Sequence, residues 1–535
     1  MTPTQEHLFK LICEIDDICK KYNIEFFMDY GTCLGAIRHE GFIPWDNDLD
    51  ITMTEDNYDK FVKACQKELD GVTRDFCDNR RNREFPTVFG HYIDKTVVRM
   101  TDHTPFWDNY VGQTIDVFPL LEVPPKKEER EDYINTFFAY DEYVNMSFRH
   151  YRRKTYDIMD KYNEMVKKEK EIGRDKVLEE VEKKLFGHHY EGCDTYLSGS
   201  ARMSNPNPVV PKEYYDNPRH AMFEDREFLV PGDWFESMTH FYGDTFNIFP
   251  KELRIHSEMS HAGLPCSIYV DDFLQTVDKE ELLAERYELK KKMMRYSEME
   301  SELIDEAYDF HCLSTILHLK ERIHKDHIKV DSLLMSDKPE DIQCLIDLFS
   351  DYFEDQFSKK TMYWKKHYDI GDGLEYAAMY ILYYYLEDTS KIDKMIELRE
   401  YNRLGLTQGM KEIQKALRIR RNIKKYMIYK DYPKAKENLD WCLENEPNSR
   451  NTKIWELRYH VATEEDKDTL MQWMNRAKEL LEMYPDNMYI RKAQGDLYEK
   501  LGQQDEADKI YDELSETSND GLLLLDIRKK REARG

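Results

Sequence analysis

The chain has 535 residues, of which 41% are hydrophobic and 13% aromatic. That apolar content is enough for packed cores and excludes wholesale disorder, and the length favours two or three domains over one. With 106 acidic against 78 basic residues, the formal net charge is -28, which repels phosphate backbones, so nucleic acid is not an expected partner.

Residues 1–125 are predicted to form a mixed α/β region. An amphipathic helix opens it, because apolar residues recur at helical spacing, namely Leu8, Leu11, Ile12, Ile15 and Ile18. A strand over 25–30 follows, then a turn at Gly31 and a short helix over 33–39 with Thr32 as its N-cap. Three further strands are expected over 49–53, 97–100 and 114–118. A further helix is expected over 56–69.

Beyond residue 125 the character of the sequence changes. Residues 126–187 are charged, lack proline and have helical periodicity, which predicts a helical insertion. Residues 188–275 are rich in proline, so the chain is expected to fold back over the first region as loops and short strands. Residues 280–410 are predicted to be helical, and 411–535 to form helical repeats. The expected fold class is therefore α+β for 1–275 and all-α beyond.

The C-terminal segment carries an internal repeat. Its step from Pro447 to Pro485 is slightly longer than the ~34 residues of a tetratricopeptide repeat. The last unit matches that pattern best, through Gly495, Leu497, Tyr498, Ala507 and Tyr511. Helical hairpins of tetratricopeptide type are therefore predicted for this region.

The most informative segment, residues 30–51, contains three alternating carboxylates, Asp46, Asp48 and Asp50. Side chains alternate between the two faces of a strand, so Asp48 and Asp50 are expected on the same side. Two like charges that close are unfavourable unless a cation lies between them. Hard oxygen ligands at this spacing suit Mg²⁺.

The alternative interpretation of these acids is a solvated acidic turn. Against it, Gly31 and Gly35 precede them and let backbone N–H groups approach phosphate oxygens. A further carboxylate, Asp116, lies between apolar residues of an expected strand, where burial without a partner is costly. Alone it would be a hydrogen-bonded structural residue, whereas on a strand next to Asp50 it would complete a carboxylate triad.

Residues 24–53 resemble the signature of the LicD family, whose relatives include the fukutin-type transferases. The pattern is Gly-[Thr/Ser]-x-Leu-Gly-Ala-x-Arg-x-x-Gly-x-Ile-Pro-Trp-Asp-x-Asp-[Leu/Ile/Val]-Asp, and every fixed position is satisfied. Asn47 departs from the family, which often carries Asp there. Three later segments also resemble family blocks, at 115–120, 223–231 and 241–244. The resemblance covers roughly residues 1–260 and implies a nucleotidyltransferase-like mixed sheet with flanking helices.

The resemblance implies metal-dependent transfer of phosphocholine from CDP-choline to a sugar of a teichoic acid, lipopolysaccharide or capsule. Asp48 and Asp50 would then hold Mg²⁺ or Mn²⁺, with Asp46 as a weaker ligand candidate. Asp116 would be either a third ligand or the base that accepts the proton of the acceptor hydroxyl. These are expectations from the resemblance, and the two roles of Asp116 stay open.

The donor's phosphates are expected to lie against the short helix. Gly31, Thr32 and Gly35 would cradle a phosphate, and Arg38 would pair with it in bidentate fashion. The alternative for Arg38 is an ordinary surface arginine. Further candidates are Lys95 and Arg99 for phosphate, and Tyr30, Trp45, Phe106 and Trp107 for a choline headgroup.

Two other hypotheses remain. One keeps the fold and changes the donor to CDP-ribitol, CDP-glycerol or another nucleotide-linked compound. The other is a helical-repeat scaffold with a vestigial catalytic domain, since repeat arrays commonly present concave binding surfaces. In an active enzyme the repeats are expected to dock a protein partner or to grip the glycan or glycolipid acceptor.

The sequence also indicates a location. No stretch approaches the ~20 apolar residues that span a bilayer, and residues 1–10 lack the pattern of a signal peptide. The ten cysteines show no Cys-x-x-Cys spacing, which argues against a zinc finger or a disulfide framework. A cytoplasmic protein is expected, either free or peripheral at the inner membrane face.

Overall fold

The computed structural model describes residues 1–83, 85, 87–98, 112–145, 158–199, 208–250, 264–265, 310–336, 338–356 and 370–534. The chain forms two compact units. One consists of Met1–Phe241 and Glu252–His311, and the other of Tyr242–Lys251 and Cys312–Gly535. The expected boundary near residues 275–280 lies outside the described residues. Within the described ranges, no helix is long and apolar enough to cross a membrane.

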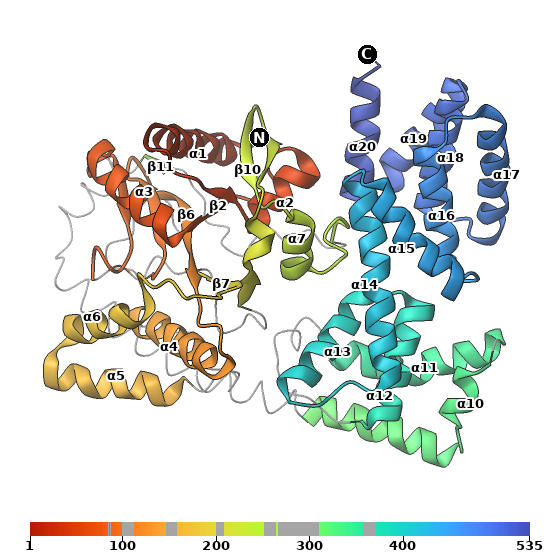
Figure 1. Cartoon of the computed structure of the whole chain (residues 1–535), viewed down its shortest axis with the longest axis horizontal. Helices are drawn as coiled ribbons and strands as arrows, with labels where there is room; N and C mark the ends of the chain where they lie inside the picture. The colour runs from red at the N-terminus through yellow and green to blue at the C-terminus, as the bar shows by residue number, and fades with distance from the viewer. Residues whose placement is uncertain are drawn as a thin grey trace. The chain divides into compact units, whose positions relative to one another are not determined.

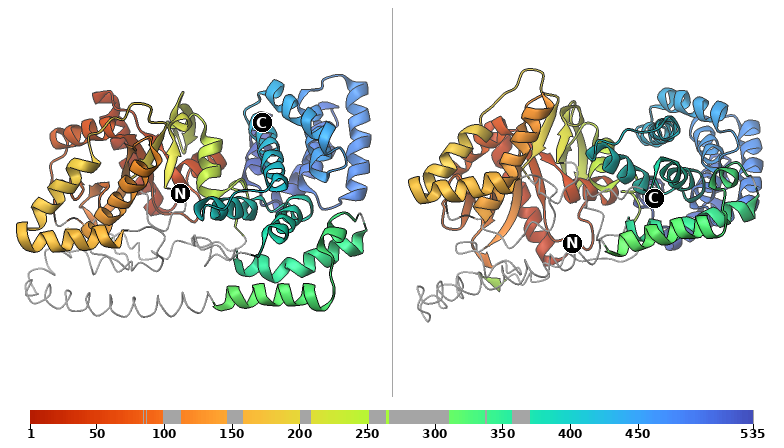
Figure 2. Two further views of the ribbon diagram at one scale, coloured as in Figure 1. Left: turned by 60° about the horizontal axis from the view of Figure 1, so that its bottom comes forward. Right: turned by 90° about the horizontal axis from the view of Figure 1, so that it is seen from below.

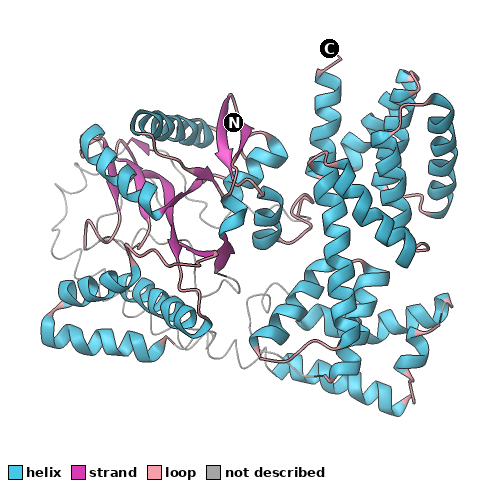
Figure 3. Ribbon diagram, viewed as in Figure 1, coloured by secondary structure: helices cyan, strands magenta, loops and turns pink. Residues whose placement is uncertain are grey.

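The first unit is built on a seven-stranded mixed sheet in the order β1-β2-β6-β4-β3, with β7 and β8 continuing from β6 (Figures 1 and 3). The strands and their bounds are β1 Phe27–Met28, β2 Asp50–Thr54, β3 Arg74–Cys77, β4 Gly90–Asp94, β6 Gln113–Glu122, β7 Thr195–Ser198 and β8 Val209–Pro211. Only the β2–β6 pair is parallel. The long strand β6 is therefore the centre of the sheet and positions its neighbours on both sides.

Helices α1 (Pro3–Tyr22) and α3 (Glu55–Glu68) pack against each other and against β6. The predicted apolar stripe of α1 is confirmed, because Leu8, Leu11 and Ile12 are fully buried. A capping box between Thr2 and Gln5, with proline at the first helical turn, fixes where α1 begins.

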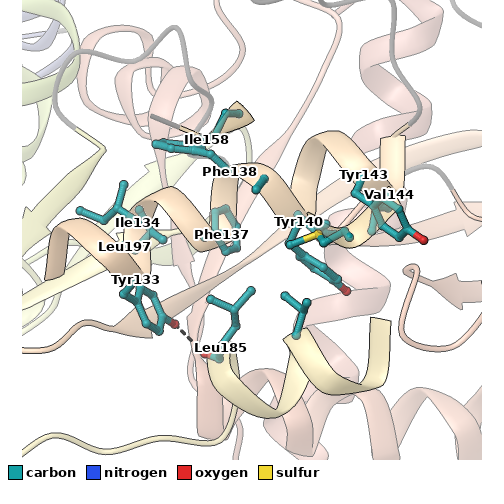
Figure 4. Packing of buried hydrophobic residues seen from close by; sticks show 14 of the residues in the cluster. Tyr133, Ile134, Phe137, Phe138, Tyr140, Tyr143, Val144, Ile158, Leu185 and Leu197 are labelled. Carbon is teal, nitrogen blue, oxygen red and sulfur yellow. Dashed lines mark hydrogen bonds between the residues drawn. The ribbon is translucent and has the colours of Figure 1, made fainter. Parts of the chain in front are cut away.

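The predicted insertion is three helices, α4 (Lys127–Asn145), α5 (Met159–Ile172) and α6 (Arg174–Leu185). Their shared core is rich in aromatic side chains, and Phe137 and Phe138 are almost completely buried in it (Figure 4). Leu121 and Leu197 of the sheet belong to the same cluster. The insertion is therefore packed onto the end of β6 rather than standing apart from the first unit.

Residues 188–250 form the expected short strands and loops, together with one helix. Besides β7 and β8, the described parts of this range, 188–199 and 208–250, include a 3₁₀ turn, η2 (Lys212–Tyr215), and helix α7 (Trp234–Tyr242). Strands β9 (Arg219–Phe223) and β10 (Arg226–Val230) form a hairpin. A further pair joins β5 (Val97–Val98) to β11 (Leu264–Pro265).

Beyond residue 310 every described element is helical, as predicted. The first of these helices spans 310–325. The helices after it are α10 Val330–Leu334, α11 Pro339–Gln356, α12 Asp372–Ile381, α13 Thr389–Tyr401, α14 Gln408–Ile428, α15 Tyr432–Asn445, α16 Arg450–Thr463, α17 Lys467–Met483, α18 Met488–Lys500, α19 Gln504–Thr517 and α20 Gly521–Glu532. A turn of π-helix, η3 (Leu382–Leu386), extends α12. The expected boundary at 411 falls inside α14.

Helices α14 to α20 follow one another as packed neighbours, which is the arrangement that a helical repeat produces (Figure 2). Pro447 and Pro485 lie just beyond the ends of α15 and α17, where a proline stops a helix without removing a hydrogen bond. Gly495 of α18 lets the ring of Tyr511 approach closely, because an added Cβ would lie 2.8 Å from that ring. The tetratricopeptide type of the repeat stays a prediction.

The segment 242–251 is part of the helical unit. The carboxylate of Asp244 accepts a hydrogen bond of 3.0 Å from Arg421 and pairs with Thr389. Lys424 donates to Asn247 over 2.7 Å, and the N–H of Gly521 donates to the carbonyl of Asn247 over 2.8 Å. The block at 241–244 that resembles the LicD family thus ends where the chain enters the helical unit.

Candidate active site

Three polar residues stand in one row across neighbouring strands of the sheet. Asp50 of β2 is the register partner of Asp116 of β6, and Asp116 is in turn the partner of His91 of β4. Register partners on neighbouring strands project from the same face of a sheet. The expectation that Asp116 lies on a strand next to Asp50 is therefore met, and the row includes a histidine that the sequence did not single out.

Asp116 interrupts a strand that is otherwise closed to solvent. Every residue of β6 from Gln113 to Leu121 is buried except Asp116, whose side chain is 28% exposed. Asp50 is likewise half-buried. A charged side chain avoids most of the desolvation penalty when it keeps access to water. Both carboxylates therefore keep access to solvent, where a ligand can reach them.

The backbone at the start of β2 is held from two sides. The N–H of Asp50 donates to Oγ1 of Thr32 over 2.7 Å, and the N–H of Asp116 donates to the carbonyl of Leu49 over 3.1 Å. The carbonyl of Asp50 accepts from the N–H of Asp29 over 3.3 Å. The position of Asp50 is thus tied to helix α2 as well as to the sheet.

Helix α2 spans Tyr30–His39, so it begins earlier than predicted. Its N-cap is Asp29, whose carboxylate accepts from the N–H of Tyr30, and the prediction of Thr32 as N-cap is wrong. Tyr30 adopts a φ of 47°, a left-handed conformation that is strained for a tyrosine. Gly31 and Thr32 therefore lie in the first turn of the helix, where backbone N–H groups and the helix dipole favour an anion.

Asp29 joins three elements beneath this site. Its fully buried carboxylate accepts from the hydroxyl of Tyr215 in η2 over 2.7 Å and from the hydroxyl of Thr52 in β2 over 3.1 Å. Burial raises the pKa of Asp29 to about 6, although these hydrogen bonds act in the opposite direction. Asp29 was missed by the sequence interpretation, yet an Asp directly before a short helix is a standard N-cap signal.

The Asp29 carboxylate is expected to make the first unit less stable as the pH rises from 5 to 7.5. Because the folded-state pKa is raised from 3.8 to about 6, the folded chain binds this proton more tightly than the unfolded chain does. That stabilisation is complete below the ordinary pKa and is lost as the pH rises through about 6. Thermal unfolding of wild type and Asp29→Asn at both pH values should show wild type losing about 1 kcal/mol relative to the variant. Equal responses would contradict this assignment.

Gly35 lies in the second turn of α2 and has a packing role. A Cβ at this position would lie 2.6 Å from the carbonyl oxygen of Gly41, a distance at which backbone must shift. The absence of a side chain therefore lets α2 pack against the loop that leads to the acidic residues. The expected role of Gly35 in cradling phosphate remains a prediction.

The acidic segment itself is a turn followed by a strand. Asp46 accepts a hydrogen bond from the N–H of Asn47 over 3.1 Å, and Gln5 of α1 donates to the carbonyl of Asp46 over 2.9 Å. Strand β2 begins at Asp50, one residue later than predicted, so Asp48 precedes it and the alternation of a strand does not fix the side to which Asp48 points. Asp48 is half-buried, like Asp46 and Asp50.

The cationic candidates are spread out. Arg38 is buried in the last turn of α2, about 10 Å along the helix axis from Gly31, and its Nε donates to Nε2 of His39 over 3.1 Å. Lys95 forms an ion pair of 2.5 Å with Asp75. Arg99, Phe106 and Trp107 lie outside the described residues.

The donor set fits a hard divalent cation that shares its coordination with a substrate. Within the part of the chain that the structure describes, no group of three or more His, Cys, Asp or Glu is arranged to hold a metal by itself. Mg²⁺, however, is usually bound through one or two carboxylates, with substrate phosphates and water completing its shell. Asp50 and Asp116, on one face and in register, meet that requirement.

A mixed sheet bearing paired aspartates beside the first turn of a helix is the architecture of a nucleotidyltransferase domain. Residues 23–155 match the family model described as "LicD/FKTN/FKRP, nucleotidyltransferase domain". This part of the chain is therefore a LicD-family domain. All of the row Asp50, Asp116 and His91 falls within it.

The chain is also similar to individual proteins. It is 25% identical over 240 residues to "Lipopolysaccharide cholinephosphotransferase LicD" of Haemophilus influenzae, which covers 44% of this chain and 87% of that protein. Over 44 residues, or 8% of this chain, it is 46% identical to "Uncharacterized protein RP689" of Rickettsia prowazekii and to "Uncharacterized protein RT0683" of Rickettsia typhi. That stretch is 16% and 14% of their lengths, respectively. No solved structure matches the chain.

Proposed function

We propose that this chain is a metal-dependent enzyme of LicD type that transfers phosphocholine, or a similar phospho-substituent, from a CDP-linked donor to a sugar of a cell-surface glycan. The observation that carries the proposal is the register pair of Asp50, at the start of β2, and Asp116 of β6. The backbone of Asp50 is in turn hydrogen-bonded to Thr32 in the first turn of α2. The similarity to a lipopolysaccharide cholinephosphotransferase supports the same reaction class.

Different residues of the site would bind the metal ion and the donor's phosphates. Asp50 and Asp116, with Asp48 two residues before Asp50, would hold Mg²⁺ or Mn²⁺, and the bound ion would neutralise the donor's phosphate charge and stabilise the CMP leaving group. The first turn of α2, with Gly31 and Thr32, would orient the same phosphates through its N–H groups. Positioning and charge neutralisation supply most of the catalysis in phosphoryl transfer.

The transfer itself exchanges one bond for another. The oxygen of the acceptor hydroxyl bonds to the phosphorus that carries the headgroup, and the bond from that phosphorus to CMP breaks. The proton of the hydroxyl must leave as the new bond forms. Asp116, when it does not ligate the metal, is the carboxylate of the row that would accept it.

The direct test is release of CMP from CDP-choline by the full-length chain, with and without EDTA. CDP-ribitol and CDP-glycerol should be assayed side by side, because the carboxylate row binds the phosphates common to all three donors and does not by itself select the headgroup. We expect CMP release that EDTA abolishes and that Mg²⁺ or Mn²⁺ restores. No metal-dependent turnover with any CDP donor would contradict the proposal and leave the helical scaffold as the better account.

A further inference from the structure

His91 lies directly against the candidate catalytic carboxylate. Its Nδ1 is 2.9 Å from Oδ1 of Asp116, and the contact is a short electrostatic pair and not an ideal hydrogen bond. The histidine side chain is 4% exposed, against 28% for the aspartate. The pair therefore has a buried half in β4 and a half in β6 that is open to solvent.

The other ring nitrogen of His91 has a defined partner. Nε2 lies 2.9 Å from the hydroxyl oxygen of Thr87, and that hydroxyl donates its only hydrogen to the carbonyl of Phe89 over 3.0 Å. A hydroxyl has one hydrogen to give. The Thr87 oxygen must therefore accept from His91, which makes Nε2 a donor and fixes which way the ring is turned.

Aromatic rings hold the imidazole in place. The ring centroids of Phe85 and Phe89 lie 5.3 Å and 4.9 Å from that of His91, and Phe89 also packs on Phe118 of β6 at 4.5 Å. An imidazole ring that packing and a hydrogen bond already confine loses little further conformational entropy when it contacts the Asp116 carboxylate. His91 is thus built as a rigid support, with Nδ1 directed at Asp116.

We propose that His91 is a positioning residue that sets the orientation of the Asp116 carboxylate relative to Asp50. The contact is attractive when a proton lies between Nδ1 and Oδ1, and the rigid ring then fixes the position of this oxygen. The inference rests on the proposed function for its catalytic meaning. It holds whether Asp116 ligates the metal or accepts the proton, since both roles need a fixed carboxylate.

Two substitutions at this position separate the contacts of the ring. In His91→Asn the side-chain amide can occupy the place of Nδ1, which keeps a hydrogen-bonding group next to Asp116 and gives up the contact with Thr87. In His91→Gln the amide nitrogen can occupy the place of Nε2, which keeps Thr87 and gives up Asp116. Both variants replace the same buried ring, so each serves as the structural control for the other.

We expect His91→Gln to lower kcat for CMP release by about 10- to 100-fold with the donor KM unchanged, and His91→Asn to stay within a few-fold of wild type. Equal losses in both variants, or a loss that follows their unfolding temperatures, would overturn the proposal. The reverse order of activities would overturn it as well.

A readout independent of turnover keeps the two proposals apart. Crystal structures of both variants should show the wild-type side-chain conformation of Asp116 in His91→Asn and a different one in His91→Gln. An unchanged Asp116 in His91→Gln would refute the role of His91. Absence of CMP release by the wild type would count against the proposed function, while this structural comparison would still decide the positioning role.

Discussion

Replacing Asp50 with asparagine is expected to slow CMP release by about 10³-fold, which corresponds to about 4 kcal/mol of lost transition-state stabilisation. Asp50 opens β2, and its backbone N–H is held by Thr32. The substitution therefore removes a charge while leaving the local geometry in place. The measurement is kcat at saturating Mg²⁺, together with the unfolding temperature, which should change little because the side chain is half-buried.

Asp46→Asn is the matched control for this variant. Asp46 lies in the same acidic segment, but its carboxylate accepts the N–H of Asn47 within the turn, a contact that an amide oxygen can also make. We expect this variant to retain activity within about tenfold, as befits the weaker ligand candidate. Full activity in Asp50→Asn, or equal losses in both variants, would remove Asp50 from the catalytic machinery.

Replacing Asp116 with asparagine is the second large effect, a loss of about 10²- to 10³-fold in kcat. The dependence of this loss on Mg²⁺ concentration distinguishes a metal ligand from a general base. If Asp116 is a ligand, raising Mg²⁺ should recover part of the activity, because the variant binds the ion more weakly. If Asp116 is the base, kcat should stay low at every Mg²⁺ concentration.

Glu122→Gln provides the control on the same strand. Glu122 ends β6 and pairs with Lys212 at 2.5 Å, away from the row. The variant should keep its turnover within a few-fold while losing a partly exposed ion pair. Retention of full activity by Asp116→Asn would show that this carboxylate is structural, which was the alternative left open by its apolar neighbours in sequence.

Much of the site could be predicted because its chemistry is local in sequence. The strand predicted over 49–53 corresponds to β2, although Asp46 and Asp48 precede it and only Asp50 of the three acids lies in the strand. Helical periodicity was enough to predict α1, the insertion and the helical region after residue 310. Such patterns are reliable because each element buries one face of its own.

The start of α2 was misplaced for a physical reason. Phe26, Phe27 and Met28 are apolar and favoured an extended strand up to Tyr30, yet the strand ends at Met28 and Asp29 caps the helix. The cap depends on a backbone conformation at Tyr30 that this residue type rarely adopts. Contacts from distant Tyr215 and from Thr52 stabilise it, and local propensity does not include such contacts.

His91 could not be identified from the sequence for a similar reason. It is a single histidine on a buried strand, and such residues are more often core histidines than parts of a site. Its meaning comes from the register between β4 and β6, which pairs it with Asp116. Register between strands far apart in the chain is set by the packing of the whole sheet.

The most direct test of the carboxylate row is anomalous diffraction from a crystal of the full-length chain containing Mn²⁺ and a CDP donor. We expect a manganese peak within coordinating distance of a carboxylate oxygen of Asp50, with Asp116 on the same side of the sheet and the donor's phosphates at the first turn of α2. A manganese ion bound elsewhere, with the donor away from Asp50 and Asp116, would contradict the account.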